Sequence, residues 1–309
     1  MNKPDPALRA SCEKLATEAP NPATADLGRL ASVDPVAAVG LMLEADRGLL
    51  DALSSASIDI AAVARAAATA LESGGRLIYI GAGTSGRLGV LDAVECPPTF
   101  QVDDSRVVGI LAGGHGAMFA AVEGIEDNPE AGARDLAEHK VGPLDLVVGI
   151  SASASAPYVH GAIAHANSAG AATAMIACVT KAERGDEATL SVRIPTGPES
   201  LAGSTRLRAG TATKMALNMI STLAMAARGK VHGNLMVDVN TAGNHKLLVR
   251  GRGLVVQLVP CNPDRAAALL NEAGGAVKVA VVMGRKGLNQ KEAKARLDQV
   301  GGVLGDVLG

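Results

Sequence analysis

The sequence predicts an α/β fold, a three-layer αβα sandwich built around a mainly parallel sheet, followed by a small helical C-terminal module. From Arg76 onward, short apolar runs alternate with helical segments, which is the pattern of a parallel sheet between two helical layers. Beyond Lys246 the pattern changes to successive helix caps. We therefore expect one large domain at residues 1–245, including N-terminal helices, and a helical module at residues 246–309.

The elements of the large domain follow the chain in a simple order. Two helices precede the sheet, at 36–52 and at 58–71, the second after a candidate cap at Ser57. The expected strands are residues 77–80, 107–111, 146–150, 173–177 and 191–194. A long helix at about 206–227 follows them.

The C-terminal module carries recognisable helix starts. Asn262 and Pro263 are a cap and a first-turn proline, and Asn289 with Glu292 resembles a capping box. Residues 276–283 have the composition of a strand. Their position between two capped helices favours a buried helix instead.

Residues 76–99 join a buried strand, a glycine-rich loop and a helix expected to begin near Arg87. The loop contains Gly81, Gly83, Thr84, Ser85 and Gly86. Glycines let the backbone approach an anion closely, and the two hydroxyls are hydrogen-bond donors. The free N–H groups at the start of the helix point at the same place. The pattern predicts an oxyanion site.

The three glycines also match the dinucleotide pattern G-x-G-x-x-G, so an NAD site is an alternative. That pattern requires an acidic residue at the end of the second strand. Here strand 107–111 runs into Ala112-Gly113-Gly114-His115, and Asp103 and Asp104 lie before it. We therefore expect no cofactor. A glycine turn that serves only strand-to-helix packing is the remaining alternative.

A second hydroxyl-rich loop has the same form. Ser151, Ser153 and Ser155 directly follow the apolar run at 146–150, and Pro157 opens the next helix. Ligands of parallel sheets bind beyond the carboxyl ends of the strands. The sequence therefore predicts that both loops contact a phosphate or a sugar, Gly83, Thr84 and Ser85 from the first and the serines from the second.

Composition excludes several classes of function. A net charge of −2, two Tyr, two Phe and no Trp disfavour nucleic-acid binding. No apolar run approaches the length of a membrane span, and no targeting segment is evident at the N-terminus. The four cysteines, Cys12, Cys96, Cys178 and Cys261, are scattered, which suits reduced thiols. The six histidines form no metal-binding motif, and His115 and His160 are expected to make local hydrogen bonds. We expect a cytoplasmic protein without membrane contact or metal.

Three glutamates are candidates for acid–base chemistry. Glu95 is expected at the end of its helix, stopped by Cys96-Pro97-Pro98, where the helix dipole and any burial would raise its pKa above about 4.3. Glu123 and Glu126 lie three apart near the expected end of the next helix. Most glutamates are exposed and only contribute surface charge. Of these three, Glu95 is the strongest candidate for chemistry, because it lies in the same strand–loop–helix segment as the predicted oxyanion loop.

Four segments, in order, carry a resemblance to a known family: GAGTSGRLGVLDAVECPPTF, AVEGIEDN, GSTRLRAGTATKMALNMIST and GKVHGNLMVDVN. They resemble the bacterial N-acetylmuramic acid 6-phosphate etherases, which belong to the sugar isomerase (SIS) fold superfamily. The match runs from Thr17-Glu18 into the C-terminal module. It implies the SIS fold, cleavage of the lactyl ether of a sugar phosphate to give N-acetylglucosamine 6-phosphate and D-lactate, and a homodimer with active sites near the interface.

The implied chemistry is an elimination followed by addition of water. In the open-chain sugar, the carbon 1 aldehyde acidifies the proton on carbon 2, and the lactyl oxygen on carbon 3 is a β leaving group. The resemblance assigns the acid to the glutamate of ECPPT, Glu95. Glu126 matches the second active-site carboxylate of the family and is the candidate base. Two glutamates of opposite protonation suit such a step.

The second loop departs from the family pattern. Relatives usually read Ser-Gly-Arg-Thr-Pro-Tyr where this chain reads Ser-Ala-Ser-Ala-Pro-Tyr at 153–158. Loss of a charged hydrogen bond costs roughly 1.5–3 kcal/mol. The candidates that could compensate are Ser155, Arg87, Arg206 and Lys214. A non-catalytic sugar-phosphate sensor and a sugar-phosphate isomerase are the alternative functions of this fold.

Overall fold

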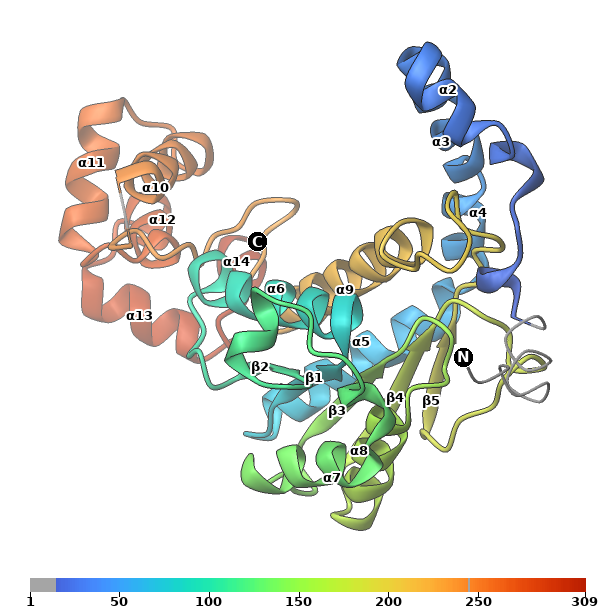
Figure 1. Ribbon diagram of the computed structural model, residues 1–309. Coiled ribbons are helices and arrows are strands. Elements are labelled where there is room, and N and C mark those ends of the chain that lie inside the picture. The colour runs from blue at the N-terminus through green and yellow to red at the C-terminus, as the bar shows by residue number, and fades with distance from the viewer. Residues whose placement is uncertain (1–14, 244) are drawn as a thin grey trace, which may run out of the picture. The chain divides into compact units, whose positions relative to one another are not determined.

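The computed structural model describes residues 15–243 and 245–309 (Figure 1). The chain divides into two compact units, Met1–Asp92 with Val108–Ile220, and Ala93–Val107 with Ser221–Gly309. Helices α6 and α9 begin in the first unit and end in the second. The domain boundary expected at residues 245 and 246 stays a prediction. Cys12 lies outside the described residues.

The first unit holds the sheet and most of the helices. In chain order its elements are η1 (Ala16–Glu18), η2 (Pro22–Thr24), α2 (Leu27–Val33), α3 (Pro35–Asp46), α4 (Leu49–Ser55), α5 (Ser57–Glu72), β1 (Leu77–Gly81), the start of α6 (Gly83–Phe100), β2 (Val107–Leu111), η3 (His115–Met118), η4 (Ile125–Asp127), α7 (Pro129–Glu138), β3 (Leu146–Ile150), α8 (Pro157–Ser168), β4 (Ala172–Ala177), β5 (Leu190–Arg193) and the start of α9 (Arg208–Ala227).

The five strands form one sheet in the order β2-β1-β3-β4-β5. β1 pairs with β3, β3 with β4 and β4 with β5, all in parallel. Gly81, at the end of β1, lies opposite Ile150, at the end of β3. The loops that follow these two strands therefore leave the sheet side by side. The predicted parallel α/β fold is confirmed.

Helices cover both faces of the sheet (Figure 1). Ile78 and Ile80 share a buried cluster with Tyr158 and Val159 of α8. The intervening Tyr79 points the other way and donates a hydrogen bond from its hydroxyl to Asp92 of α6, 2.9 Å away. Alternation along a strand sends neighbouring side chains to opposite faces, so a continuous apolar run is what a sheet between two helical layers requires.

Two glycines let α7 and α8 touch through their backbones. A Cβ built on Gly132 of α7 would lie 1.9 Å from the carbonyl oxygen of Tyr158, and one on Gly161 of α8 would lie 2.0 Å from that of Pro129. Real atoms do not approach so closely, and the clashes are with backbone rather than flexible side chains. The Tyr158 hydroxyl also donates to Asp135 of α7. This helix pair fixes the direction in which α8 leaves the sheet.

Several helix boundaries differ from expectation. The expected helix 36–52 is two helices, α3 and α4, separated at Arg47 and Gly48. Ser57, the expected cap, is instead the first residue of α5, and Ala56 occupies the cap position. α6 starts at Gly83 rather than near Arg87, so the hydroxyl residues of the first loop lie in its first turn.

The expected end of α6 is also wrong, because the helix continues through Pro97 and Pro98 to Phe100. The backbone angles of proline fit a helix, and each ring removes one N–H. The Gln101 amide donates to the Pro97 carbonyl over 2.9 Å, which closes the last turn. Glu95 therefore lies one turn inside the helix rather than at its negative end.

The second unit contains the C-terminal helices α10 (His245–Leu258), α11 (Pro263–Glu272), α12 (Val277–Lys286), α13 (Gln290–Asp298) and α14 (Leu304–Leu308), packed around one apolar core. The Asn262 cap and the capping box of Asn289 with Glu292 are confirmed, as is the helix at 277–286. Within the described ranges no single helix could cross a membrane by length and composition. The pair α11 and α12, bent by 114°, passes that test together, and buried residues of both helices belong to this core.

Candidate functional site

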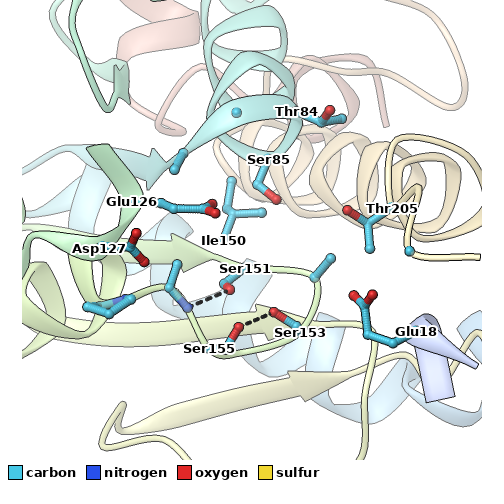
Figure 2. Close-up of a pocket in the computed structure, with 16 residues that line it drawn as sticks. Glu18, Thr84, Ser85, Glu126, Asp127, Ile150, Ser151, Ser153, Ser155 and Thr205 are labelled. Atoms are coloured by element: carbon cyan, nitrogen blue, oxygen red, sulfur yellow. Dashed lines mark hydrogen bonds between the residues drawn. The ribbon is translucent and has the colours of Figure 1, made fainter. Parts of the chain in front are cut away.

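A cavity of about 390 Å³ opens in the first unit at the carboxyl ends of β1 and β3. Polar side chains from five parts of the chain lie around it (Figure 2). The lining residues with hydroxyl or carboxyl groups are Glu18, Thr84, Ser85, Glu126, Asp127, Ser151, Ser153, Ser155 and Thr205. The two loops predicted from the sequence to contact a ligand thus share one cavity.

The glycines of the first loop have separate tasks. A Cβ on Gly86 would lie 2.3 Å from the Gly81 carbonyl oxygen, so these two allow the helix to start directly against the end of β1. Gly83 has a φ of +53° and open space around it, and it lines the cavity. Close packing therefore accounts for two of the three glycines. The third, Gly83, supplies the left-handed φ at the start of α6, in the wall of the cavity.

The second loop is fixed by hydrogen bonds along its backbone. The Ala152 carbonyl accepts from the Cys178 amide over 2.7 Å, and the Ala154 amide donates to the Ser151 carbonyl over 2.9 Å. His160 of α8 bonds the Ala154 carbonyl through Nε2, at 2.8 Å, which makes that nitrogen the donor. The Ser153 and Ser155 hydroxyls bond each other beside the cavity (Figure 2).

Carboxylates face the cavity from opposite sides. Glu126 lies on the side of η4, and Glu18 on the side of η1 (Figure 2). Glu18 packs against Gly203, where an added Cβ would lie 2.8 Å from its Oε2. The Gly203 amide donates to the Thr17 carbonyl over 3.2 Å and holds the two segments together. Three acids, with Asp127, therefore line the cavity.

A buried glutamate anchors the segment that brings Thr205 to the cavity. Glu199 is fully buried, and its carboxylate accepts from the amides of Arg208 and Ala209, at 2.7 and 3.0 Å, at the start of α9. Burial raises the pKa of Glu199, and these two amides oppose that rise. Arg208 also donates from Nη1 to the Pro198 carbonyl at 2.6 Å. The segment between the two residues is thereby held at both ends.

Sequence reasoning missed four polar or glycine positions of this cavity: Glu18, Asp127, Gly203 and Thr205. A signal existed for Glu18, because the family resemblance begins at Thr17-Glu18. Thr205 and Gly203 lie within the GSTRLRAGTATKMALNMIST segment, but the residues predicted from that segment are Arg206 and Lys214. Arg206 and Lys214 are both exposed, and neither lines the cavity.

The other predicted residues lie elsewhere. Glu95 belongs to the second unit, is exposed, and does not line the cavity. Arg87 lines a smaller neighbouring cavity. Glu123 and Glu126 were expected on a helix, and this is wrong: Glu123 lies in a turn and Glu126 in the short η4, separated by the left-handed Gly124.

The lining explains which ligands the main cavity can take. Two helices, α6 and α8, begin at its wall, and five hydroxyls from the two loops surround their first turns. Helix N-termini and hydroxyl donors suit an oxyanion such as a phosphate. Among the described residues, no group of three or more His, Cys, Asp and Glu side chains is arranged to hold a metal ion.

Comparison with known proteins finds a matching family model and several relatives in sequence. Residues 59–167 match the model of the glucokinase regulatory protein N-terminal SIS domain. The chain is 49% identical to the N-acetylmuramic acid 6-phosphate etherase of Cutibacterium acnes, covering 93% of each chain. It is 46% identical to the etherase of the same name from Mycolicibacterium smegmatis, covering 96% of this chain and 98% of the relative.

A solved structure, a phosphoheptose isomerase from Francisella tularensis, aligns with 63% of this chain and 98% of its own at 15% identity and a TM-score of 0.43. The identity and coverage of the etherases decide the family. This chain belongs to the N-acetylmuramic acid 6-phosphate etherases.

Proposed function

We propose that this protein cleaves the D-lactyl ether of N-acetylmuramic acid 6-phosphate, giving N-acetylglucosamine 6-phosphate and D-lactate, in the recycling of cell-wall sugars. The observation that carries the proposal is the hydroxyl-lined cavity with Glu126 in its wall, in a chain of this family. Cys96, Cys178 and Cys261 are thiols rather than disulfides, which suits a reducing compartment, and we place the reaction in the cytoplasm.

The phosphate occupies the hydroxyl-rich part of the main cavity. Thr84 and Ser85 approach it from the start of α6, and Ser151, Ser153 and Ser155 from the loop before α8. Contact with helix N-termini and with hydrogen-bond donors stabilises a dianion. Ser155 stands where relatives carry arginine, so here the phosphate is held by hydroxyls and amides.

The sugar then extends toward Glu126. As the base, Glu126 removes the proton from carbon 2, the electron pair forms a carbon 2–carbon 3 double bond, and the bond from carbon 3 to the lactyl oxygen breaks. Glu95, as the acid, protonates the departing lactate. Water next adds across the double bond, its hydroxyl to carbon 3 and a proton to carbon 2, which restores the saturated sugar. No redox change or nucleotide enters this sequence.

The acid is assigned to Glu95 on the ECPPT motif, and Glu18 is its competitor because it lines the cavity opposite Glu126. Replacing each residue in turn by glutamine decides between Glu95 and Glu18, because the amide keeps the shape of the side chain but cannot transfer the proton. Both carboxylates can therefore be tested without removing a side chain.

The test is D-lactate release from N-acetylmuramic acid 6-phosphate by the purified protein and its Glu126→Gln, Glu95→Gln and Glu18→Gln variants. We expect at least a hundredfold loss in the first two, because general acid–base catalysis contributes about 10²–10⁴-fold. Exchange of the carbon 2 proton in deuterated water should persist in Glu95→Gln and disappear in Glu126→Gln. Glu130→Gln, an exposed position on α7, is the matched control.

Three outcomes contradict parts of the proposal. Full activity in Glu95→Gln with loss in Glu18→Gln moves the acid to Glu18. Rapid proton exchange in Glu126→Gln removes that residue as the base. Tight binding of the sugar phosphate without turnover by the unaltered protein identifies a sensor, and aldose–ketose interconversion without lactate identifies an isomerase.

We also propose a homodimer. Val36, Val39 and Leu43 lie at i, i+3 and i+7 of α3 and are 82%, 55% and 64% exposed, so they form one apolar stripe. A second copy of the chain is the partner that the family resemblance implies.

A further inference from the structure

A second cavity, of about 180 Å³, adjoins the main one and takes no part in the proposed elimination or in the addition of water. Ala82, Gly83 and Glu126 line both cavities. The smaller one continues beneath the segment between β2 and α7, where η3 and η4 lie. A ligand held in the main cavity and touching Glu126 could therefore place a substituent in the smaller one.

The lining of the smaller cavity fits a short apolar group. Its apolar side chains are those of Ala82, Ala112, Ala117, Ala121, Val122 and Ile125. Four of the six are alanines, so the walls are set back and contribute only methyl groups. Burial of a ligand methyl group against these walls removes apolar surface from water and so favours binding.

The charges of the cavity argue against an anionic group. Glu123 and Glu126 both line it, and its described lining, unlike that of the main cavity, includes no hydroxyl that could donate to a carboxylate placed there. Arg87 is the one cation among the described lining side chains, against two carboxylates, and its Nε and Nη2 donate to the carbonyls of Ala117, Met118 and Ala120, at 2.7 to 3.3 Å. A neutral group that can donate a hydrogen bond to a glutamate is favoured.

We propose that this smaller cavity binds the 2-acetamido group of the sugar phosphate and selects for it. This inference rests on the proposed function for the identity of the substrate. Of the two arms near the reacting carbons, the lactyl arm ends in a carboxylate, whereas the acetamido arm is neutral, ends in a methyl and carries an N–H donor. The acetamido nitrogen is bonded to carbon 2, which also bears the proton that Glu126 removes. Glu126, shared by both cavities, stands where that carbon would lie.

The experiment measures binding by titration calorimetry, so it does not depend on turnover. The two probes are N-acetylglucosamine 6-phosphate and glucose 6-phosphate, which differ at carbon 2 in having an acetamido or a hydroxyl group. We expect the unaltered protein to bind the acetamido probe at least tenfold more tightly. Ala121 is exposed and lines the smaller cavity, so the larger side chain of Ala121→Leu fills that cavity. We expect this variant to raise the dissociation constant of N-acetylglucosamine 6-phosphate at least tenfold and that of glucose 6-phosphate less than twofold.

Two controls bracket this variant. Ala120→Leu adds the same side chain at the neighbouring exposed position, which does not line the cavity, and should change neither dissociation constant. Ala152→Leu obstructs the main cavity and should weaken both probes together. Unchanged thermal unfolding of Ala121→Leu establishes that the fold is kept.

The inference is overturned if Ala121→Leu weakens the binding of both probes equally, or weakens the binding of neither. It is also overturned if the unaltered protein binds neither probe, or binds both with the same affinity. It is also overturned if Ala121→Leu raises the KM for the lactyl-bearing substrate without weakening the acetamido product, because the lactyl arm then occupies the cavity. Failure of the proposed function looks different: no lactate is released, yet the selective effect of Ala121→Leu on the acetamido probe persists.

Discussion

At the scale of single residues, Ala154 is the strained position of the site. It is fully buried in the second loop and has a φ of +52°, in the left-handed region that glycine favours. An L-residue there costs roughly 1–2 kcal/mol. The hydrogen bond from His160 Nε2 to its carbonyl offsets part of that cost, since a net contribution of about 0.5–1.5 kcal/mol is usual. His160 is therefore a positioning residue for the serines on either side.

His160→Ala should raise the KM for the sugar phosphate by about fivefold or more and leave kcat within twofold, because in the proposed complex the loop binds the phosphate and not the reacting carbons. The corresponding loss of stability is about 1 kcal/mol. His160→Gln keeps a side-chain N–H donor and should restore much of the KM. His165→Ala, on the same helix, is the control. A lower unfolding temperature with an unchanged KM would show that His160 only stabilises the fold.

The residues that could be predicted from sequence are those whose signal is local. A strand, a glycine or serine loop and a helix start are contiguous, so both loops that line the main cavity can be found from the sequence. Glu18 could not be derived in this way. It reaches the cavity through a contact with Gly203, nearly two hundred positions away, and no periodicity records such a pairing.

At the scale of elements, Asp145 joins the starts of β1 and β3, at the sheet edge opposite the site. Its carboxylate accepts from the Arg76 amide and guanidinium, at 2.7 to 3.1 Å, and from the Gly142 amide at 3.0 Å. Burial acts to raise the pKa of Asp145, but these donors outweigh it and hold the pKa below its ordinary value of 3.8. The charged form thus stabilises the folded state.

Asp145→Asn should lower the free energy of unfolding at pH 7 by roughly 1.5–3 kcal/mol, the contribution of hydrogen bonds to a charged group. A group with a lowered folded pKa stabilises above its unfolded pKa and loses that effect as pH falls through the folded value. The difference between the two proteins should therefore shrink below about pH 4. Urea unfolding at pH 7 and pH 3 measures it, with the exposed Asp104→Asn as control. A difference that does not change with pH would contradict this account.

Element types were predicted better than their ends. Strands β2 and β3 have the expected bounds, and β1, β4 and β5 differ by a residue or so, because apolar runs stop where the sheet stops. α6 differs at both ends. Its first turn includes Gly83 and Gly86, which by residue type favour a loop, and two prolines lie within its last turn.

At the scale of the whole molecule, the apolar stripe of α3 predicts the assembly. Sedimentation velocity should give a dimer for the unaltered chain, and the double variant Val36→Asp, Leu43→Asp should give a monomer with reduced lactate release. Leu144→Asp replaces another exposed apolar residue and should remain dimeric. A monomeric unaltered chain, or a double variant that stays dimeric, would remove the stripe as the contact.

The division into units could not be predicted from composition. The C-terminal helices were recognisable by their caps, yet their unit also includes residues 93–107 and 221–244. Two helices, α6 and α9, pass from one unit to the other without a break. A boundary inside a continuous helix has no proline-rich or glycine-rich linker to mark it.

The glycine pair between α7 and α8 limits how this protein can vary. At Gly132 and Gly161 even alanine would drive a methyl into a carbonyl of the facing helix. Neither position tolerates a change unless the helices separate, and α8 then no longer presents the serine loop. In a saturation library selected for activity, both positions should return glycine alone. Substitutions on this side of the sheet can therefore accumulate at neighbouring positions, while these two positions stay fixed.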